Sequence, residues 1–525
     1  MAWHANIPEG HESFEIKYDI VPYTRGRVLD LGSGPYKTFP HFISWDNYSG
    51  WENYNWRPDV IGDAQKLDII GSKSVDAVFS SHLLEHIDDH ISALKEWWRV
   101  IKIGGYLVLY LPHKDLYPNI GEKGVNVNHK HDFLPKDIIS ILKENCTNWD
   151  LVEAFVKNGE DEYSFLQVFQ KLPPGSGQKY TYAEKRPLKT CGIVRYGGIG
   201  DMLQASSIIA RLKKEGYAVY LHTTPQGKEI LEFDKNIDKF ILQDTDQVPN
   251  HELRDFWDCL SKKYDKFVNL SESVEGSWLA LEGRTKHFWP QEVKHKYMDV
   301  NYIEFAYDLA GLSDMPPEPI IFYPSKREEK RAKINYDKMA GEHGIIITWT
   351  LSGSSLHKVW PYVDAVIARF MLETRNIHFV LVGDDYCRIL EAGWEKEPRV
   401  HLRSGKWSIR ETLAFAQISD LVIGPETSLL QLDTVKRIVF LSHSSPKNLT
   451  KYWKNAIVLT PADCECYPCH MMHHGHTYCN TVEVKMHDGT AKAAKCKANI
   501  SPDRVIQAII DALGIKKQEK RLNAA

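Results

Sequence analysis

The sequence predicts an α/β protein of several domains whose strands form parallel sheets. Short apolar runs alternate with helical stretches over residues 27–112, and the same alternation begins again at residue 191. Strands that alternate with helices are typical of parallel sheets, which bind ligands at the carboxyl ends of their strands. Between the two parts lies a polar stretch, residues 173–190, with three prolines and two glycines. We expect this stretch to be a linker.

The composition places the chain among ordinary globular proteins. Its 525 residues, 43% hydrophobic and 26% charged, are enough for several domains at about 150 residues each. The formal net charge of −4 gives no overall electrostatic reason to expect nucleic acid or an anionic membrane as partner. No apolar run approaches the ~18 residues of a membrane helix, and residues 1–15 lack the regions of a signal peptide. We therefore expect a cytoplasmic protein without membrane insertion.

Acidic residues follow the strands of the N-terminal part. Residues 27–34 (RVLDLGSG) predict an apolar strand that ends in an acid and a Gly-x-Gly turn. The elements that follow are a strand at 41–46, an acidic turn at 62–67, a strand at 75–81, a helix at 81–101 and a strand at 104–112. Acids at the ends of the first two strands suit a ligand with hydroxyls and an ammonium group rather than a bare phosphate.

This order of elements resembles the Rossmann-like S-adenosylmethionine-dependent methyltransferases over residues 21–172. The resemblance implies a methyltransferase domain, residues 1–172, with S-adenosylmethionine as cofactor. The residues implied by position are Asp30, Gly32 and Gly34 at the methionine end, Asp46 at the ribose, Asp63 and Ala64 beside the adenine, and Ser81, His82 and Leu83 closing the pocket. For each acid taken alone, a solvated strand end or a helix cap is the alternative.

The chain departs from this family in one respect. Only eleven residues, including Pro35 and Pro40, separate Gly34 from Asp46, so the usual first helix has no room. Family members that modify sugars often share this short form, which favours a sugar-containing substrate.

Histidines are the candidates for the base that methyl transfer to a hydroxyl requires. His82 and His86 lie four residues apart on the predicted helix, the spacing of a ligand pair, although a packed or exposed histidine is commoner. Residues 128–137 follow the last motif strand, and the resemblance implies that such a segment covers the substrate mouth. His129 or His131 would then be the base, with a solvent-exposed loop as the alternative.

After the linker, two further sets of strands and helices follow. Residues 191–201 (CGIVRYGGIGD) predict a strand, a glycine-rich turn and the start of a helix that continues over 202–215. Further strands are predicted at 217–223, 239–243 and 266–271. A second set follows: a strand that enters a Gly/Ser turn at 344–355, a strand at 378–385, and a strand that ends in a polar turn at 420–432. A basic, helical stretch within residues 316–344 connects the two sets. This layout predicts two Rossmann-like domains that face a cleft.

The layout resembles the GT-B glycosyltransferases, in particular the heptosyltransferase-like family nine, over residues 191–513. The motifs that carry the resemblance are GGIGDML (197–203), LSGSSLHKVWP (351–361), FVLVGDD (379–385) and GPETSLLQL (424–432). The resemblance implies an acceptor-side domain, 191–335, and a nucleotide-sugar-binding domain, 336–525. The residues it implies for the donor are Ser352, Lys358, Gly383, Glu426, Thr427, Ser428 and Gln431, with Asp201 as the catalytic base.

The chemistry of a nucleotide-sugar donor gives these residues a role. The diphosphate gains negative charge as it leaves, and a fixed cation with helix N-termini can stabilise that charge without a metal. Lys358 matches the family's diphosphate lysine, with a surface lysine as the alternative. Asp201 matches the family's acid at the glycine-rich turn; a helix cap is its alternative, and both roles can coexist.

This second part also departs from its family. Where the family commonly has Gly-x-Asp-Thr-Gly followed by a histidine, this chain has Glu426, Ser428 and Gln431. Glutamate keeps the charge of aspartate, but glutamine removes a titratable donor. The departure leaves open a weakened or changed activity.

Five of the nine cysteines lie near the C-terminus. Cys464, Cys466, Cys469 and Cys479 form a C-x-C-x₂-C-x₉-C motif, with histidines at 470, 473, 474 and 476 and a later Cys496. These ligand types suit a structural, tetrahedral zinc ion. Reduced, packed or redox-paired thiols are the alternative.

The sequence thus predicts a bifunctional transferase that adds a methyl group and a sugar to small-molecule or glycan substrates, most economically to one glycan or glycosylated acceptor. One alternative is that the substrate is DNA or a modified base, against which the near-neutral charge speaks. The other is that the C-terminal part is a non-catalytic binding module. The sugar, the nucleotide base, the acceptor and the oligomeric state do not follow from the sequence.

Overall fold

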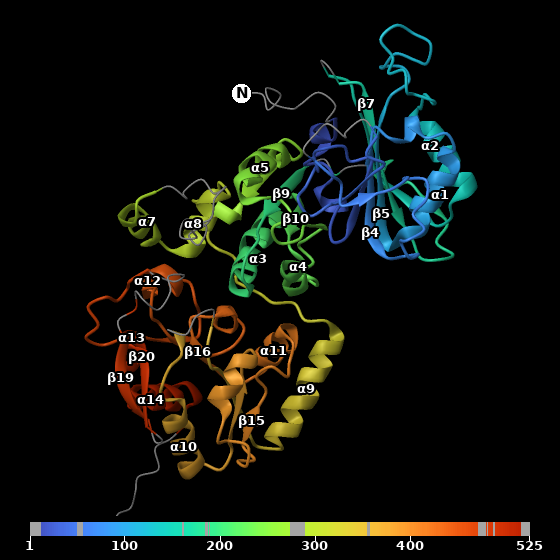
Figure 1. Cartoon of the computed structure of the whole chain (residues 1–525). Helices are drawn as coiled ribbons and strands as arrows, with labels where there is room; N and C mark the ends of the chain where they lie inside the picture. The colour runs from blue at the N-terminus through green and yellow to red at the C-terminus, as the bar shows by residue number, and fades with distance from the viewer. Residues whose placement is uncertain are drawn as a thin grey trace, which may run out of the picture. The chain divides into compact units, whose positions relative to one another are not determined.

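The computed structural model of the protein describes residues 12–49, 56–159, 162–183, 187, 189–272, 289–353, 358–470, 479, 481–486 and 489–515. The chain divides into two compact units (Figure 1). Unit 1 comprises Met1–Leu188 and Leu242–Cys259, and unit 2 comprises Lys189–Ile241 and Leu260–Ala525. None of the described helices has the length and apolar character needed to cross a bilayer.

Unit 1 contains an eight-stranded sheet in the order β3-β2-β1-β4-β5-β7-β6-β8. Its strands are β1 (Val28–Leu31), β2 (Ile43–Asp46), β3 (Val60–Ile61), β4 (Val75–Ser81), β5 (Ile101–Pro112), β6 (Trp149–Lys157), β7 (Ser164–Lys171) and β8 (Gln178–Lys179). The five strands from β3 to β5 pair in parallel, whereas β7 runs antiparallel to β5 and β6. The strand order reverses between β1 and β4, which is where open α/β sheets bind ligands.

Two helices, α1 (His90–Val100) and α2 (Pro135–Asn145), lie side by side in unit 1 (Figure 1). Trp97 of α1 and Trp149 of β6 are fully buried in the core between helices and sheet. As expected from its length and prolines, the connection from Gly32 to Phe42 contains no helix. The predicted parallel α/β fold is thus confirmed in unit 1.

The helix predicted over residues 81–101 is shorter in the structure. His82 has a φ of +49°, which no α-helix accommodates, and only a short 3₁₀ turn, η4 (Leu84–His86), precedes α1. The carboxylate of Asp89 accepts the backbone N–H of Ser92 and caps α1. His82 and His86 therefore do not share a helix face, and the prediction that they do was wrong.

Unit 1 also takes in a segment from within the second part of the chain, Leu242–Cys259. Asp244 accepts bonds from Arg25 Nε and Gly26 N, at 2.9 and 2.8 Å, and Glu252 pairs with the nearly buried Lys17. Gln247 Nε2 donates to the backbone oxygen of Val21. These polar contacts explain why the segment belongs to unit 1. Within the predicted linker, β8 pairs with β6.

Unit 2 contains two parallel sheets. The first has the order β11-β10-β9-β12 and consists of β9 (Thr190–Val194), β10 (Ala218–Thr223), β11 (Lys239–Leu242) and β12 (Lys266–Asn269). The second has the order β15-β14-β13-β16-β17-β18 and consists of β13 (Ile345–Thr350), β14 (Ile377–Val382), β15 (Val400–Leu402), β16 (Leu421–Pro425), β17 (Arg437–Phe440) and β18 (Ala456–Leu459). Both sheets reverse their order once, at β9 and β12 and at β13 and β16, as two Rossmann-like halves do.

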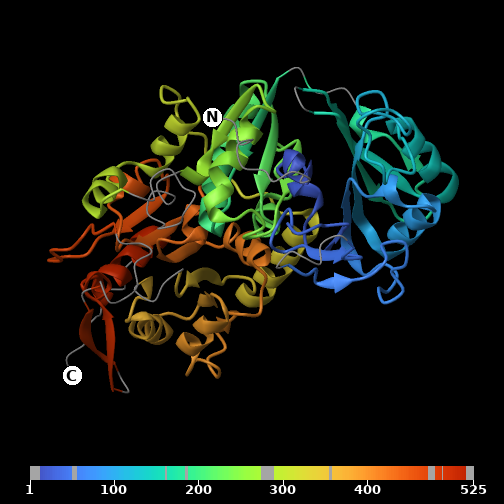
Figure 2. The same cartoon turned by 45° about the horizontal axis from the view of Figure 1, so that its top comes forward.

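Helices connect these strands. They are α3 (Ile199–Lys214), α4 (Pro225–Leu231), α5 (Leu253–Ser261), α7 (Gln291–Met298), α8 (Tyr302–Leu309), α9 (Lys326–Ala340), α10 (Val363–Glu373), α11 (Ile409–Ala416), α12 (Pro446–Leu449), α13 (Lys495–Ala498) and α14 (Pro502–Leu513). The basic connecting helix is α9, which packs against α11 and β13 of the second half. Strands β19 (Thr481–Met486) and β20 (Gly489–Ala494) form a separate antiparallel hairpin (Figure 2).

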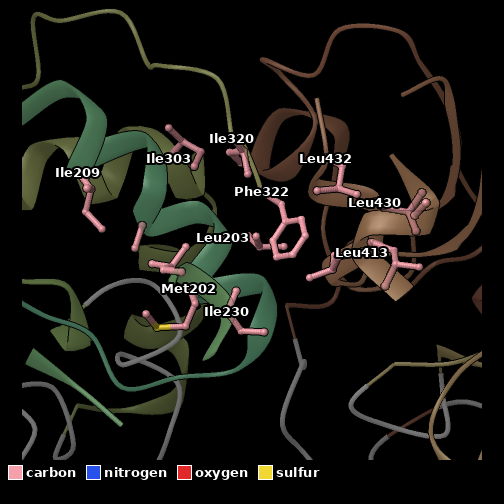
Figure 3. Close-up of a cluster of buried hydrophobic side chains, with 14 of the residues drawn as sticks. Met202, Leu203, Ile209, Ile230, Ile303, Ile320, Phe322, Leu413, Leu430 and Leu432 are labelled. Atoms are coloured by element: carbon pink, nitrogen blue, oxygen red, sulfur yellow. The ribbon is translucent and has the colours of Figure 1, made fainter. Parts of the chain in front are cut away.

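One apolar core joins the two halves of unit 2. Leu203 on α3 and Ile230 on α4 belong to the same buried cluster as Leu413 on α11. Figure 3 shows Phe322, from the segment that connects the halves, between these two groups. The core therefore continues from one half into the other.

Arg410, on α11, adds a polar connection beside this core. Its Nε and one terminal nitrogen donate to the two carboxylate oxygens of Glu328, at 2.7 and 2.8 Å. The remaining N–H groups reach the backbone oxygens of Glu229, Ile230 and Tyr323. All five guanidinium donors are satisfied, and the group is nearly buried.

We predict that Arg410→Met destabilises unit 2 and does so more at neutral than at acidic pH. Burial alone would raise the pKa of Glu328, but Arg410 and Ser325 outweigh it and lower that pKa to about 2. The stabilisation is thus present above the unfolded value near pH 4.5 and is lost as the pH falls towards 2. Removing one partner of a largely buried pair costs about 3–5 kcal/mol. Denaturant midpoints at pH 7 and pH 3 measure the effect.

The matched control is Leu372→Ala, on α10, whose side chain is 86% exposed. This substitution should change the free energy of unfolding by less than about 0.5 kcal/mol at either pH. Equal losses for Arg410→Met at pH 7 and pH 3 would contradict an ionic contribution.

Candidate functional sites

Unit 2 contains a cavity of about 640 Å³. It lies at the carboxyl ends of β9, β13, β14 and β16, so both halves contribute to its wall. The residues predicted for this part of the chain all line it: Asp201, Ser352, Lys358, Gly383, Glu426, Thr427, Ser428 and Gln431. The structure thus brings together groups that lie more than two hundred residues apart in the sequence, while their roles stay predictions.

Asp201 lies in the first turn of α3, directly after the glycine-rich turn. One carboxylate oxygen accepts the backbone N–H of Gly198 at 2.9 Å, which is the cap considered from the sequence. The other oxygen lies 3.1 Å from a guanidinium nitrogen of Arg195, a side chain that is itself nearly buried. Asp201 is therefore held in one orientation at the cavity wall.

Lys358 and Glu426 form the charged part of the opposite wall. The ammonium of Lys358 donates to the backbone oxygen of Glu426 at 3.1 Å, and both residues are almost completely buried. A Cβ on Gly353 would lie 2.8 Å from Cδ of Lys358 and 2.6 Å from Cγ2 of Thr427. Only glycine at 353 leaves room for the lysine beside the threonine.

Glu426 is surrounded by further polar groups. Its carboxylate accepts two bonds from the backbone N–H of Ser442 and one from its hydroxyl, and it lies 2.8 Å from Nδ1 of His443. The ammonium of Lys497 lies 3.9 Å away. Burial alone would raise the pKa of Glu426, but Lys497, His443 and Lys358 outweigh it and lower that pKa. Glu426 is therefore a buried carboxylate whose charge is compensated.

His443 was missed in the sequence analysis. It follows β17, next to β16 in the sheet, and it lines the cavity. The polar stretch SHSS at 442–445, directly after an apolar strand, was the available signal. The family motif has a titratable histidine where this chain has Gln431. His443, which follows the neighbouring strand, instead supplies a histidine to the same cavity.

Thr427 and Gln431 line the cavity, and each has a buried oxygen. Thr427 Oγ1 and Gln431 Oε1 have no hydrogen-bond partner among the described residues. A buried polar atom without a partner is costly. Thr427 is followed by the four-residue 3₁₀ turn η10 (Ser428–Gln431), which offers a phosphate less dipole than an α-helix would.

In unit 1, the predicted cofactor residues lie at the carboxyl ends of β1, β2 and β4. Gly32 has a φ of +69°, and a Cβ there would lie 2.9 to 3.0 Å from three atoms of Leu83. The carboxylate of Asp46 accepts the backbone N–H groups of Gly34 and Tyr48. Asp30 is buried in β1, and this burial raises its pKa to about 8.

The other predicted cofactor residues occupy the neighbouring strand ends. Asp63 is exposed, and its carboxylate accepts the backbone N–H of Gln65. The backbone oxygen of Ala64 accepts the indole N–H of Trp97. His82 directly follows Ser81, the last residue of β4, and its Nε2 lies 2.9 Å from the hydroxyl of Ser164.

His131, the predicted base for methyl transfer, is engaged through one ring nitrogen. Its Nε2 lies 3.0 Å from the backbone oxygen of Ile87 and 3.3 Å from that of Asp88. Carbonyl oxygens only accept, so Nε2 carries a proton and only Nδ1 can act as a base in the neutral ring.

The C-terminal thiols lie partly together. Cys464 Sγ is 3.6 Å from Cys466 Sγ, and burial followed by this contact raises the pKa of Cys464 to about 11. Burial raises the pKa of Cys496 to about 12, with Cys479 and Cys464 contributing. Histidines 473, 474 and 476 lie outside the described residues, and the zinc ion stays a prediction.

Comparison with known proteins connects unit 1 to one family. Residues 47–109 match a family model described as a methyltransferase domain. The match includes Asp63, Ala64 and Ser81–Leu83 but begins after Asp46. The predicted resemblance of the N-terminal part to methyltransferases is confirmed. A comparison with curated proteins gave no match.

Several solved structures are similar to parts of the chain. A glycosyl transferase family 9 protein from Veillonella parvula is 16% identical, covering 64% of this chain and 99% of its own, with a TM-score of 0.46. ADP-heptose lps heptosyltransferase II of E. coli is 14% identical, covering 62% and 98%, with a TM-score of 0.44. A SAM-dependent methyltransferase from Archaeoglobus fulgidus is 18% identical, covering 30% and 97%, with a TM-score of 0.24. The chain thus resembles both kinds of protein, as predicted.

We predict that Gly32→Ala destabilises unit 1 by about 2–5 kcal/mol, because the alanine combines an unfavourable φ with a clash against Leu83. Gly175→Ala is the matched control. Gly175 has a φ of +87°, but a Cβ there meets nothing within 4 Å, so only the backbone cost of about 1–2 kcal/mol remains. Thermal unfolding of both variants measures the difference, and equal shifts would refute the close approach of Leu83.

Proposed function

We propose that the protein is a bifunctional transferase. Unit 1 transfers a methyl group from S-adenosylmethionine, and unit 2 transfers a sugar from a nucleotide sugar, with a glycan or glycosylated molecule as acceptor. Within unit 2, residues 191–335, apart from Leu242–Cys259, form the acceptor side, and residues 336–525 form the donor side. The observation that carries the proposal is the unit 2 cavity, whose wall combines Lys358 from one half with the fixed carboxylate of Asp201 from the other.

One cation of the cavity wall suits a diphosphate. Lys358 and Lys497 lie beside Glu426, and of these two lysines Lys358 is the one that lines the cavity. Lys358 is nearly buried, so an anionic ligand gains more from its charge than it would in water. Lys358 lines the cavity and would stabilise the negative charge that develops on the leaving nucleoside diphosphate.

Asp201 would act on the acceptor, as the base that takes up its proton. The acceptor oxygen forms a bond to the anomeric carbon while the bond from that carbon to the diphosphate breaks. The acceptor proton passes to the carboxylate of Asp201, which Arg195 and Gly198 hold in place. Trp407, which also lines the cavity and lies under the guanidinium of Arg403, offers a face on which the nucleotide base can stack.

The strand ends of unit 1 fit S-adenosylmethionine. Gly32 lacks the Cβ that would fill the space beside Leu83, and the buried Asp30 would regain its charge next to an ammonium group. Each oxygen of Asp46 retains a lone pair for a ribose hydroxyl besides its bond to a backbone N–H. When bound, the cofactor supplies a methyl group on a sulfonium, and the chain's task is to orient the acceptor in line with it.

We expect Lys358→Ala and Asp201→Asn to lower glycosyl transfer without unfolding unit 2. Asparagine keeps the acceptor that caps α3, so its effect reports on the base, and each variant should lose about 10²–10³-fold in rate. The donor is found first, by measuring which of ADP-, UDP-, GDP- and CMP-sugars raises the unfolding midpoint. Lys338→Ala, an exposed lysine on α9, is the control. Wild-type rates in Asp201→Asn, or no stabilisation by any of these sugars, would favour a different or non-catalytic role.

We further expect release of S-adenosylhomocysteine to depend on a sugar-containing acceptor. The short connection between β1 and β2 leaves room for a bulky polar substrate, and the net charge of −4 does not favour DNA. Product release is measured with glycans, with the product of unit 2, and with single- and double-stranded DNA. Turnover with DNA alone would refute the joint action on a glycan.

A further inference from the structure

Three side chains of unit 1 converge on a point that the transferase chemistry does not explain. Glu85 and His86 belong to η4, and His129 comes from the loop between β5 and α2. One ligand atom from each lies within 4.8 Å of the others. The Oε1 atom of Glu85 is 3.9 Å from Nε2 of His86 and 3.9 Å from Nε2 of His129.

The backbone fixes this arrangement. The backbone oxygen of Glu85 accepts the N–H groups of Lys130, at 2.8 Å, and of His131, at 3.2 Å. The loop that carries His129 is therefore hydrogen-bonded to the residue with which His129 converges. Two segments more than forty residues apart thus present their side chains to one point by main-chain contacts.

The carboxylate of Glu85 is the second, independent observation. The side chain is fully buried, and neither Oε1 nor Oε2 has a hydrogen-bond partner among the described residues. A buried carboxyl without partners is strongly unfavourable. Its burial also raises the pKa of Glu85 to about 8. A cation placed between Glu85 and the two imidazoles would remove this penalty.

The tautomer of His86 and the exposure of both histidines suit metal binding. Nδ1 of His86 lies 3.0 Å from the backbone oxygen of Asn128, which can only accept, so Nδ1 carries the proton and Nε2 presents its lone pair towards Glu85. The side chain of His129 is 5% exposed and that of His86 is 26% exposed, so the point is accessible from the His86 side.

We propose that Glu85, His86 and His129 bind a divalent transition-metal ion. Two imidazoles and one carboxylate suit Zn²⁺, Mn²⁺ or Fe²⁺ better than Mg²⁺ or Ca²⁺, which prefer oxygen ligands alone. Ligand atoms about 2.1 Å from a tetrahedral ion lie about 3.4 Å apart, so each of the two 3.9 Å distances from Glu85 to a histidine would shorten by about half an ångström on binding. Three protein ligands leave a position open for water or an oxygen of a substrate. Metal binding here does not depend on either transferase activity.

The test is Mn²⁺ binding to the full chain after treatment with a chelator. Thiolates bind Mn²⁺ poorly, so the C-terminal cysteines do not compete, and a Cys464→Ser background verifies this. We expect one bound Mn²⁺ per chain by electron paramagnetic resonance. Glu85→Gln and His129→Gln should each weaken binding by at least about a hundredfold. His90→Gln is the control, because His90 contacts His131 but none of the three ligands.

The stability of Glu85→Gln separates a metal site from a structural cluster. Without metal, this variant should unfold at the same midpoint as the wild type or a higher one, because it removes a buried acid that has no partner. With Mn²⁺, only the wild type and His90→Gln should gain stability. No bound Mn²⁺, equal affinity in Glu85→Gln, or complete loss of binding in Cys464→Ser would overturn the proposal.

Discussion

The guanidinium group of Arg410 is the contact on which the geometry of unit 2 depends. On α11 of the second half, it bonds to the carboxylate of Glu328 and to backbone oxygens of the first half and of the connecting segment, and it contacts the rings of Phe233 and Phe322. The apolar core around Phe322 supplies most of the attraction between the halves, but apolar contacts have little directional preference. Five directed hydrogen bonds select one arrangement. The cavity exists because the strand ends of both halves are kept in that arrangement.

The candidate sites of the two units differ in their buried charges. Burial raises the pKa values of Asp30 and Glu85 in unit 1 to about 8. In unit 2, Lys358 and Lys497 lie beside the buried Glu426. Buried charge without compensation is costly. This difference motivates the proposals of a cationic ligand in unit 1 and of a diphosphate beside Lys358 in unit 2.

Local features of the sequence predicted the strands and the glycine turns well. The apolar runs before Gly32 and before Gly198 form β1 and β9, because strands buried on both faces of a parallel sheet require such runs. Short-range patterns failed where a contact came from elsewhere in the chain. The helix expected from Ser81 begins only at His90, since Asp89 caps it and His82 adopts a positive φ.

Side chains that reach a site through tertiary contacts could not be assigned to it from the sequence pattern. His443 reaches the cavity because β17 lies beside β16, and a strand order cannot be read from one sequence. Likewise, Glu85 stands in a stretch that looks like an ordinary helix, and only the path of the loop at His129 gives it a partner. The candidate site in unit 2 was predicted because its motifs are contiguous, whereas these contributions from neighbouring elements were not.

The segment Leu242–Cys259, which belongs to unit 1, determines whether the protein can be cut into two independent parts. This segment supplies Asp244, Gln247 and Glu252 to unit 1, although it lies between β11 and β12 of unit 2. A chain cut after residue 188 would leave Lys17, Arg25 and the backbone oxygen of Val21 without these partners. The two units are therefore interleaved in the sequence rather than consecutive, and neither is a module that recombination at the polar stretch could transfer intact to another protein.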